Sequence, residues 1–92
     1  MKALLIYVTG KVQGVAFRHS AREKALSLSL TGWVRNRKDG SVEIFVQGDQ
    51  DQVCMMEKWA QQGPPAAEVE NITVYLKDVQ KDINGFIVRP TC

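Results

Sequence analysis

The chain has 92 residues, of which 45% are hydrophobic and 24% charged, and 12 Lys and Arg against 10 Asp and Glu leave a net charge of +2. This length is enough for one packed domain and leaves little room for a second core, so we expect a single domain over residues 1–92. Because the two signs of charge are mixed and nearly balanced, the composition argues against disorder and against a dedicated nucleic-acid binder.

The sequence has no apolar run long enough to span a bilayer, and residues 1–8 lack the apolar core and cleavage pattern of a signal peptide. We therefore expect a cytoplasmic protein with no membrane partner. Cys54 and Cys92 are far apart and lack the spacing of a zinc site, and a reducing compartment would keep them as thiols. Nothing in their spacing favours a disulfide, although sequence alone leaves the pairing open.

The first half of the chain changes hydrophobic period twice. A nearly continuous apolar run over residues 4–9 predicts a central strand that ends at Gly10. Apolar residues at helical spacing then predict an amphipathic helix over residues 20–29. Residues 33–36 and 41–46 are extended segments, and the Asp-Gly pair between them indicates a β-hairpin.

The second half predicts a helix and two more strands. Residues 49–62 have helical spacing and begin with capping residues, and Gly63-Pro64-Pro65 ends the helix. Residues 69–76 alternate as a strand, with a slip between Val69 and Ile72 that predicts either a β-bulge or a later start of the strand. Residues 86–89 form a short final strand after an Asn-Gly pair.

This order predicts an α+β fold of the ferredoxin-like, split βαβ type, with an antiparallel sheet and two helices on one face. A right-handed crossover makes the first two strands parallel, so their carboxyl ends reach the same edge of the sheet. We therefore expect the loop after the first strand to lie beside the residues that end the second.

The loop over residues 10–18 is framed by glycines and leads directly into a helix. Successive N–H groups of such a turn can converge on a phosphate-sized anion, and the helix dipole reinforces them. Arg18 could fold back over the concavity as a bidentate clamp. Taken alone, such loops are common, and a tight turn with a solvated arginine is the simpler interpretation.

The second strand ends at Asn36, whose amide can orient a water molecule by accepting and donating hydrogen bonds at once. An asparagine before an Asp-Gly turn is more often part of the turn itself. The two segments together are more informative than either alone.

Residues 10–18 read Gly-Lys-Val-Gln-Gly-Val-Ala-Phe-Arg and resemble the G-x-V-Q-G-V-x-F-R signature of acylphosphatases. Residues 32–36 and 40–42 resemble the second signature of that family. The resemblance continues through Gly48, Gly63-Pro64 and residues 86–89, so it covers nearly the whole chain. It implies a small stand-alone acylphosphatase of the bacterial type, whose ferredoxin-like fold agrees with the element order.

By this resemblance, Arg18 matches the catalytic phosphate-binding arginine and Asn36 the water-orienting asparagine. The implied phosphate-binding loop consists of Gln13, Gly14, Val15, Ala16, Phe17 and Arg18. Ala16 departs from many members, which carry glycine there. The implied reaction is hydrolysis of the carboxyl-phosphate bond of a small-molecule acyl phosphate by water attack on phosphorus.

The chemistry of an acyl phosphate makes few demands on the protein, because its carboxylate leaving group needs no proton. Charge stabilisation and alignment suffice, so we expect no metal and no cofactor. His19 follows Arg18, but one helical step turns it away by about 100°, so it reads as a rim residue. Asp39 and Glu43 fit turn and exposed-strand roles.

Other functions compatible with the fold are an RNA-binding module, a non-catalytic anion-binding module, and a subdomain like that of carbamoyl-transfer proteins in hydrogenase maturation. An RNA-binding sheet needs exposed aromatic residues, and residues 41–46 offer only Phe45 on the face away from the helices. We therefore expect no nucleic-acid partner. No apolar stripe is left over after the elements are assigned, so we also expect a monomer.

Overall fold

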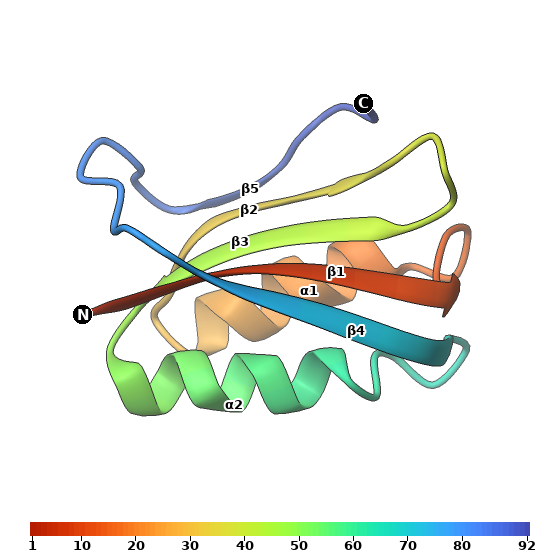
Figure 1. The fold of residues 1–92 in the computed structure, drawn as a ribbon, viewed down its shortest axis with the longest axis horizontal. Helices are drawn as coiled ribbons and strands as arrows, with labels where there is room; N and C mark the ends of the chain where they lie inside the picture. Colours follow the sequence, from red (N-terminus) through yellow and green to blue (C-terminus); the bar gives the residue numbers. More distant parts are fainter.

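Two helices cover one face of a five-stranded sheet in the computed structural model, which describes all residues from Met1 to Cys92 (Figure 1). The elements are β1 (Lys2–Lys11), α1 (Phe17–Ser27), β2 (Thr31–Asn36), β3 (Val42–Gly48), α2 (Gln50–Ala60), β4 (Glu68–Lys77) and β5 (Phe86–Val88). The α+β class and the ferredoxin-like order of elements are as predicted. Neither helix has the length and apolar character needed to cross a membrane.

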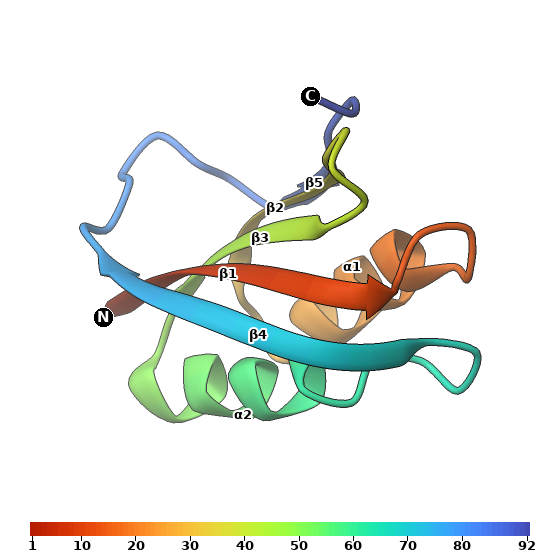
Figure 2. The same cartoon turned by 45° about the vertical axis from the view of Figure 1, so that its right-hand side comes forward.

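The strand order is β4-β1-β3-β2-β5, and β3 is antiparallel to both β1 and β2. As expected, β1 and β2 are therefore parallel to each other. The prediction of an antiparallel sheet was wrong for the last strand, because β5 pairs in parallel with β2. The strand β4 ends at the same end of the sheet at which β2 begins. From there the chain crosses to the opposite edge of the sheet, where β5 pairs with β2 (Figure 2).

The core lies between the sheet and the helices. Alternate residues of β1 and β3 point into it, including Ile6, Val8 and Ile44, which are fully buried. From the helices, Ala21 and Met56 are equally buried, and the small side chain on α1 allows the helix to approach the sheet closely. The apolar alternation of the strands thus fixes which face the helices cover.

A β-bulge interrupts the pairing of β1 with β4, which is one of the two alternatives that the slip in the sequence predicted. Thr9 pairs with Asn71 and Gly10 with Val69, so Glu70 is the extra residue. Gly10 has φ +121°, and a Cβ atom there would lie 2.2 Å from the carbonyl oxygen of Glu68. Only glycine fits this position, where β1 turns out of the sheet and into the following loop.

The opposite face of the sheet carries an ion-pair cluster centred on Glu43. Its carboxylate accepts hydrogen bonds from Arg35 Nε at 2.6 Å and from the Tyr7 hydroxyl at 2.7 Å. Glu43 is only 5% exposed, so the prediction of an exposed-strand role was wrong. Tyr7 and Arg35 lie directly opposite Glu43 on the two neighbouring strands and cover it. The hydrogen bond to Glu43 raises the pKa of Tyr7.

Aromatic side chains on this face come from β1, β2 and β4 as well as from β3. The sequence pattern of residues 41–46 indicated only the one on β3. Trp33 stacks on Phe45 at 6.0 Å, and Tyr7 meets Tyr75 edge-on at 5.9 Å. Guanidinium groups lie about 5 Å from the centres of these rings, those of Arg35 and Arg89 over Trp33 and that of Arg37 over Tyr7. Because cations cover Trp33 and Tyr7 and Phe45 is buried, Tyr75 is the ring on this face that stays most exposed, at 50%.

The Glu43 cluster generates a prediction about stability. The substitution Arg35→Ala leaves a buried carboxylate without its charged partner, and we expect it to lower the free energy of unfolding by about 2 kcal/mol. Urea unfolding measures this change. The matched control is Arg22→Ala, which removes an exposed ion pair with Glu23 and should cost less than about 0.5 kcal/mol. Equal effects of the two substitutions would contradict the proposed importance of the cluster.

Candidate active site

The loop between β1 and α1 forms a concave backbone segment at the edge of the sheet. Two of its residues adopt left-handed conformations, Gly14 with φ +74° and Ala16 with φ +61°. Turns of this kind direct successive N–H groups toward a common point. Ala16 is also the N-cap of α1, where no side chain accepts a hydrogen bond and no acidic residue occupies the first turn. The positive end of the helix dipole is therefore not neutralised by the protein.

The two ends of this loop are anchored in the core. Val12 and Phe17 are each 1% exposed. The ring of Phe17 packs against Trp59 of α2 with its centroid at 5.3 Å. Gly63, just after α2, also touches this ring, since a Cβ atom there would lie 2.6 Å from it. This packing holds the two ends of the loop against the core.

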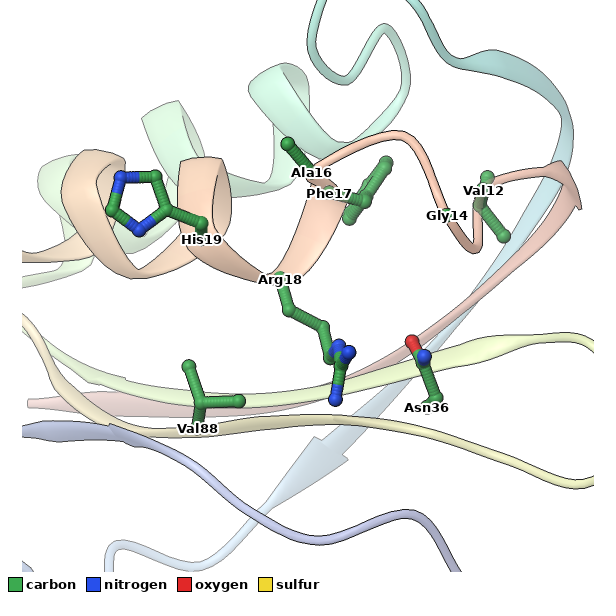
Figure 3. Close-up of a pocket in the computed structure, with 8 residues that line it drawn as sticks. All are labelled: Val12, Gly14, Ala16, Phe17, Arg18, His19, Asn36 and Val88. Atoms are coloured by element: carbon green, nitrogen blue, oxygen red, sulfur yellow. The ribbon is translucent and has the colours of Figure 1, made fainter.

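Arg18 and Asn36 approach each other across the cavity beneath the loop. Figure 3 shows the side chain of Arg18 extending from the first turn of α1 toward β2, where Asn36 ends the strand. Asn36 Oδ1 is buried and has no hydrogen-bond partner. A buried acceptor without a partner is costly, and such atoms in native proteins commonly have a functional explanation.

The cavity has a volume of about 270 Å³. It is lined by Val12, Gly14, Ala16, Phe17, Arg18, His19, Asn36 and Val88. The structure thus brings together most of the residues predicted for the site, across 18 positions of sequence between Arg18 and Asn36.

Two predicted loop residues do not line the cavity. Val15 packs against the hydrophobic core, and the Gln13 side chain bonds to the β2–β3 hairpin. Three further lining residues, Val12, His19 and Val88, were not assigned to the site from sequence. His19 was considered a rim residue, and Val88 joins the cavity only because β5 lies beside β2 in parallel. The closing resemblance over residues 86–89 was the only signal for Val88.

The β2–β3 hairpin borders the site and depends on Asp39. The Oδ1 atom of Asp39 accepts hydrogen bonds from the Ser41 hydroxyl at 2.6 Å and from the Ser41 N–H at 3.0 Å. These two bonds lower the pKa of Asp39, with a smaller contribution from the charge of Arg37. The turn role predicted for Asp39 is therefore confirmed.

No three His, Cys, Asp or Glu side chains come together in a group that could hold a metal ion. The two cysteines are unpaired, with Cys54 half-buried and Cys92 exposed.

The sequence matches the family model described as acylphosphatase over residues 4–88. The chain belongs to the acylphosphatase family. An acylphosphatase of Pelotomaculum thermopropionicum is 49% identical over 88% of this chain and 88% of its own length. The crystal structure of an acylphosphatase from Bacillus subtilis superimposes with a TM-score of 0.92 at 32% identity, covering 97% of this chain and 99% of that one. Family membership identifies the protein as an enzyme that hydrolyses acyl phosphates.

A structure of full-length HypF in a phosphate- and nucleotide-bound form is also similar, with a TM-score of 0.88 and 26% identity. The match covers 98% of this chain but only 12% of HypF. The same fold therefore also occurs as a small part of a much larger protein. The relative from Pelotomaculum thermopropionicum, by contrast, is covered over 88% of its own length.

The left-handed conformation of Ala16 generates a prediction. Residues with a Cβ atom pay about 1 kcal/mol or more in this region, so Ala16→Gly should raise the free energy of unfolding by up to about 1 kcal/mol. Chemical denaturation measures the change. Ser29→Gly is the matched control, because Ser29 has φ +57° at the other end of α1, outside the cavity. A loss of stability in Ala16→Gly alone would show that the loop is not strained.

The hydrogen bonds of Asp39 generate a prediction about pH. Because folding lowers the pKa of this carboxyl, its contribution to stability is present at neutral pH and is lost as the pH falls through the folded pKa. The difference in free energy of unfolding between the unmodified protein and Asp39→Ala should therefore become smaller as the pH falls from about 5 to about 2. Urea unfolding at several pH values tests this. A difference that stays constant over this range would contradict it.

Proposed function

We propose that the enzyme hydrolyses acyl phosphates by direct attack of water on phosphorus, with Arg18 and the loop amides holding the phosphoryl group and Asn36 orienting the water. The observation that carries this proposal is the buried, unpartnered Oδ1 atom of Asn36 in the same cavity as Arg18. An acceptor that no protein donor satisfies is available for a water molecule.

The phosphoryl group fits the loop for electrostatic reasons. Its oxygens would accept hydrogen bonds from N–H groups between Gln13 and Arg18, at the uncapped amino end of α1. The guanidinium of Arg18 adds a charged, planar pair of donors that matches two phosphoryl oxygens. Because charge on these oxygens grows and spreads in the transition state, donors fixed in advance lower the barrier.

The attacking water is aligned by the asparagine amide. Oδ1 would accept a hydrogen bond from one O–H group of the water, and this leaves a lone pair of the water oxygen directed at phosphorus. The amide is not basic enough to remove the proton completely. Its contribution is orientation, which is sufficient because the leaving group is already activated.

The bonds and charges balance without another reactant. The water oxygen forms a bond to phosphorus while the bond from phosphorus to the acyl oxygen breaks. The carboxylate departs with the electron pair, and the protons of the water pass to the phosphate product and to solvent. The scheme needs neither a metal nor a cofactor, so the small-molecule acyl phosphate is the only ligand that the proposal requires.

The test is hydrolysis of benzoyl phosphate by the purified protein in the presence of EDTA. We expect Arg18→Ala and Asn36→Ala each to lower the rate by at least ~10²-fold, by analogy with the loss of one transition-state donor. Inorganic phosphate should still inhibit Asn36→Ala but should bind Arg18→Ala weakly. This difference separates the binding role of the arginine from the orienting role of the asparagine.

Matched controls are available for both substitutions. Arg22→Ala changes an exposed arginine on the same helix, and Asn71→Ala changes an exposed asparagine on β4. Both should leave the rate unchanged. Hydrolysis that survives in Arg18→Ala and Asn36→Ala, or that EDTA abolishes, would refute the mechanism.

A further inference from the structure

The side chain of Gln13 points away from the cavity although its backbone belongs to the proposed phosphate-binding loop. Its amide nitrogen donates two hydrogen bonds, to the carbonyl oxygen of Arg37 at 2.8 Å and to that of Ser41 at 2.9 Å. Both carbonyls belong to the base of the β2–β3 hairpin, since Arg37 directly follows Asn36 at the end of β2 and Ser41 directly precedes β3. One amide group therefore connects the loop before α1 to the end of β2.

This connection lies beyond the end of the sheet. The pairing of β1 with β3 stops at Val8 and Val42, so no strand ladder joins the following loop to the hairpin. Neither the backbone nor another side chain makes a hydrogen bond between residues 12–18 and 36–41. Gln13 thus provides the only hydrogen-bonded link between the two halves of the site.

The hairpin base is well suited to receive this amide. The carbonyl of Ser41 already accepts a hydrogen bond from the Arg37 N–H at 2.8 Å, and the carbonyl of Arg37 accepts one from the Gly40 N–H at 3.1 Å. Each carbonyl oxygen has a second lone pair, which Gln13 uses. The hairpin therefore keeps its own bonds if the glutamine is removed, and what is lost is its hydrogen-bonded link to the loop.

We propose that Gln13 is a positioning residue for hydrolysis, whose side-chain amide holds the phosphate-binding loop at the distance from Asn36 that in-line attack requires. This inference rests on the mechanism proposed above. The loop and Arg18 fix the phosphorus atom, and Asn36 fixes the water. A misplacement of about 1 Å between reacting groups can cost ~10²-fold in rate, so the link between them matters more for turnover than for phosphate binding.

The first experiment replaces Gln13 by methionine, which has nearly the same shape and no donor. We expect kcat with benzoyl phosphate to fall by roughly 10- to 100-fold, whereas the inhibition constant of inorganic phosphate stays within about threefold. Gln13→Asn keeps the amide but shortens its reach, and the same result is expected. This second variant carries the test if the methionine variant does not fold.

Gln47 offers a matched control. Its buried amide also ties a strand to a loop, donating to the carbonyl of Gln80 at 2.7 Å and accepting from the Gln80 N–H at 2.7 Å. It lies at the other end of β3, away from the cavity. Gln47→Met should lower the melting temperature and leave kcat unchanged. An equal loss of kcat in both methionine variants would mean that Gln13 acts only through general stability.

A double-mutant cycle with Asn36 tests the route of the effect. If Gln13 acts by placing the loop relative to Asn36, Gln13→Met should cost less than about threefold in the Asn36→Ala background. Independent, multiplicative losses would overturn the proposal. So would a Gln13→Met variant with normal kcat while Arg18→Ala and Asn36→Ala are inactive, and that result would leave the proposed mechanism standing. Lack of acyl phosphate hydrolysis in the unmodified protein would instead refute the mechanism itself.

Discussion

The central position of β3 between β1 and β2 is the constraint on which the active site depends. Since β3 is antiparallel to both neighbours, β1 and β2 run in the same direction and end at the same edge of the sheet. The connection through α1 then brings the amino end of that helix to the same place. If β2 ran the other way, Asn36 would lie a full strand length away, about 20 Å for six residues. The crossover therefore places the two backbone segments of the site side by side, whatever side chains they carry.

The two faces of the sheet carry side chains of different kinds. Apolar side chains fill the face that the helices cover, and the buried carboxylate of Glu43 lies on the opposite face with Arg35 and Tyr7. This arrangement keeps a negative charge away from the phosphoryl group, which it would repel. The ion pair also leaves Arg18 free, because Arg35 and not Arg18 neutralises the buried acid. Charge placement thus supports the proposed chemistry without taking part in it.

The site relies on backbone geometry more than on reactive side chains. The loop is held by buried residues at both ends, and the proposal assigns direct roles to only one arginine and one asparagine. Two features carry a cost in stability, namely the left-handed Ala16 and the unpartnered Oδ1 of Asn36. Both lie at the cavity, whereas Ser29, the other non-glycine residue with a positive φ, lies at the far end of α1. Backbone strain is therefore not confined to the site.

Much of the fold could be predicted because its signals are local. Hydrophobic period, turn residues such as Asp39-Gly40, and the alternation slip near Val69 depend on a few neighbouring residues, and they located every element and the bulge. Helix α1 begins at Phe17, earlier than predicted, and the ring of that residue is buried in the core. The proximity of Arg18 and Asn36 also followed from sequence, through the handedness of the crossover.

The remaining features depended on which strands became neighbours. Glu43 alternates like an exposed residue, yet Tyr7 and Arg35 bury it from strands on both sides. Val88 lines the cavity only because β5 pairs in parallel with β2, and Gln13 turns toward a hairpin that begins more than 20 residues later. Sequence by itself determined the elements, the core face and the proposed site residues. Tertiary structure decided the burial of Glu43, the direction of β5 and the partner of Gln13, because each depends on contacts between segments distant in the chain.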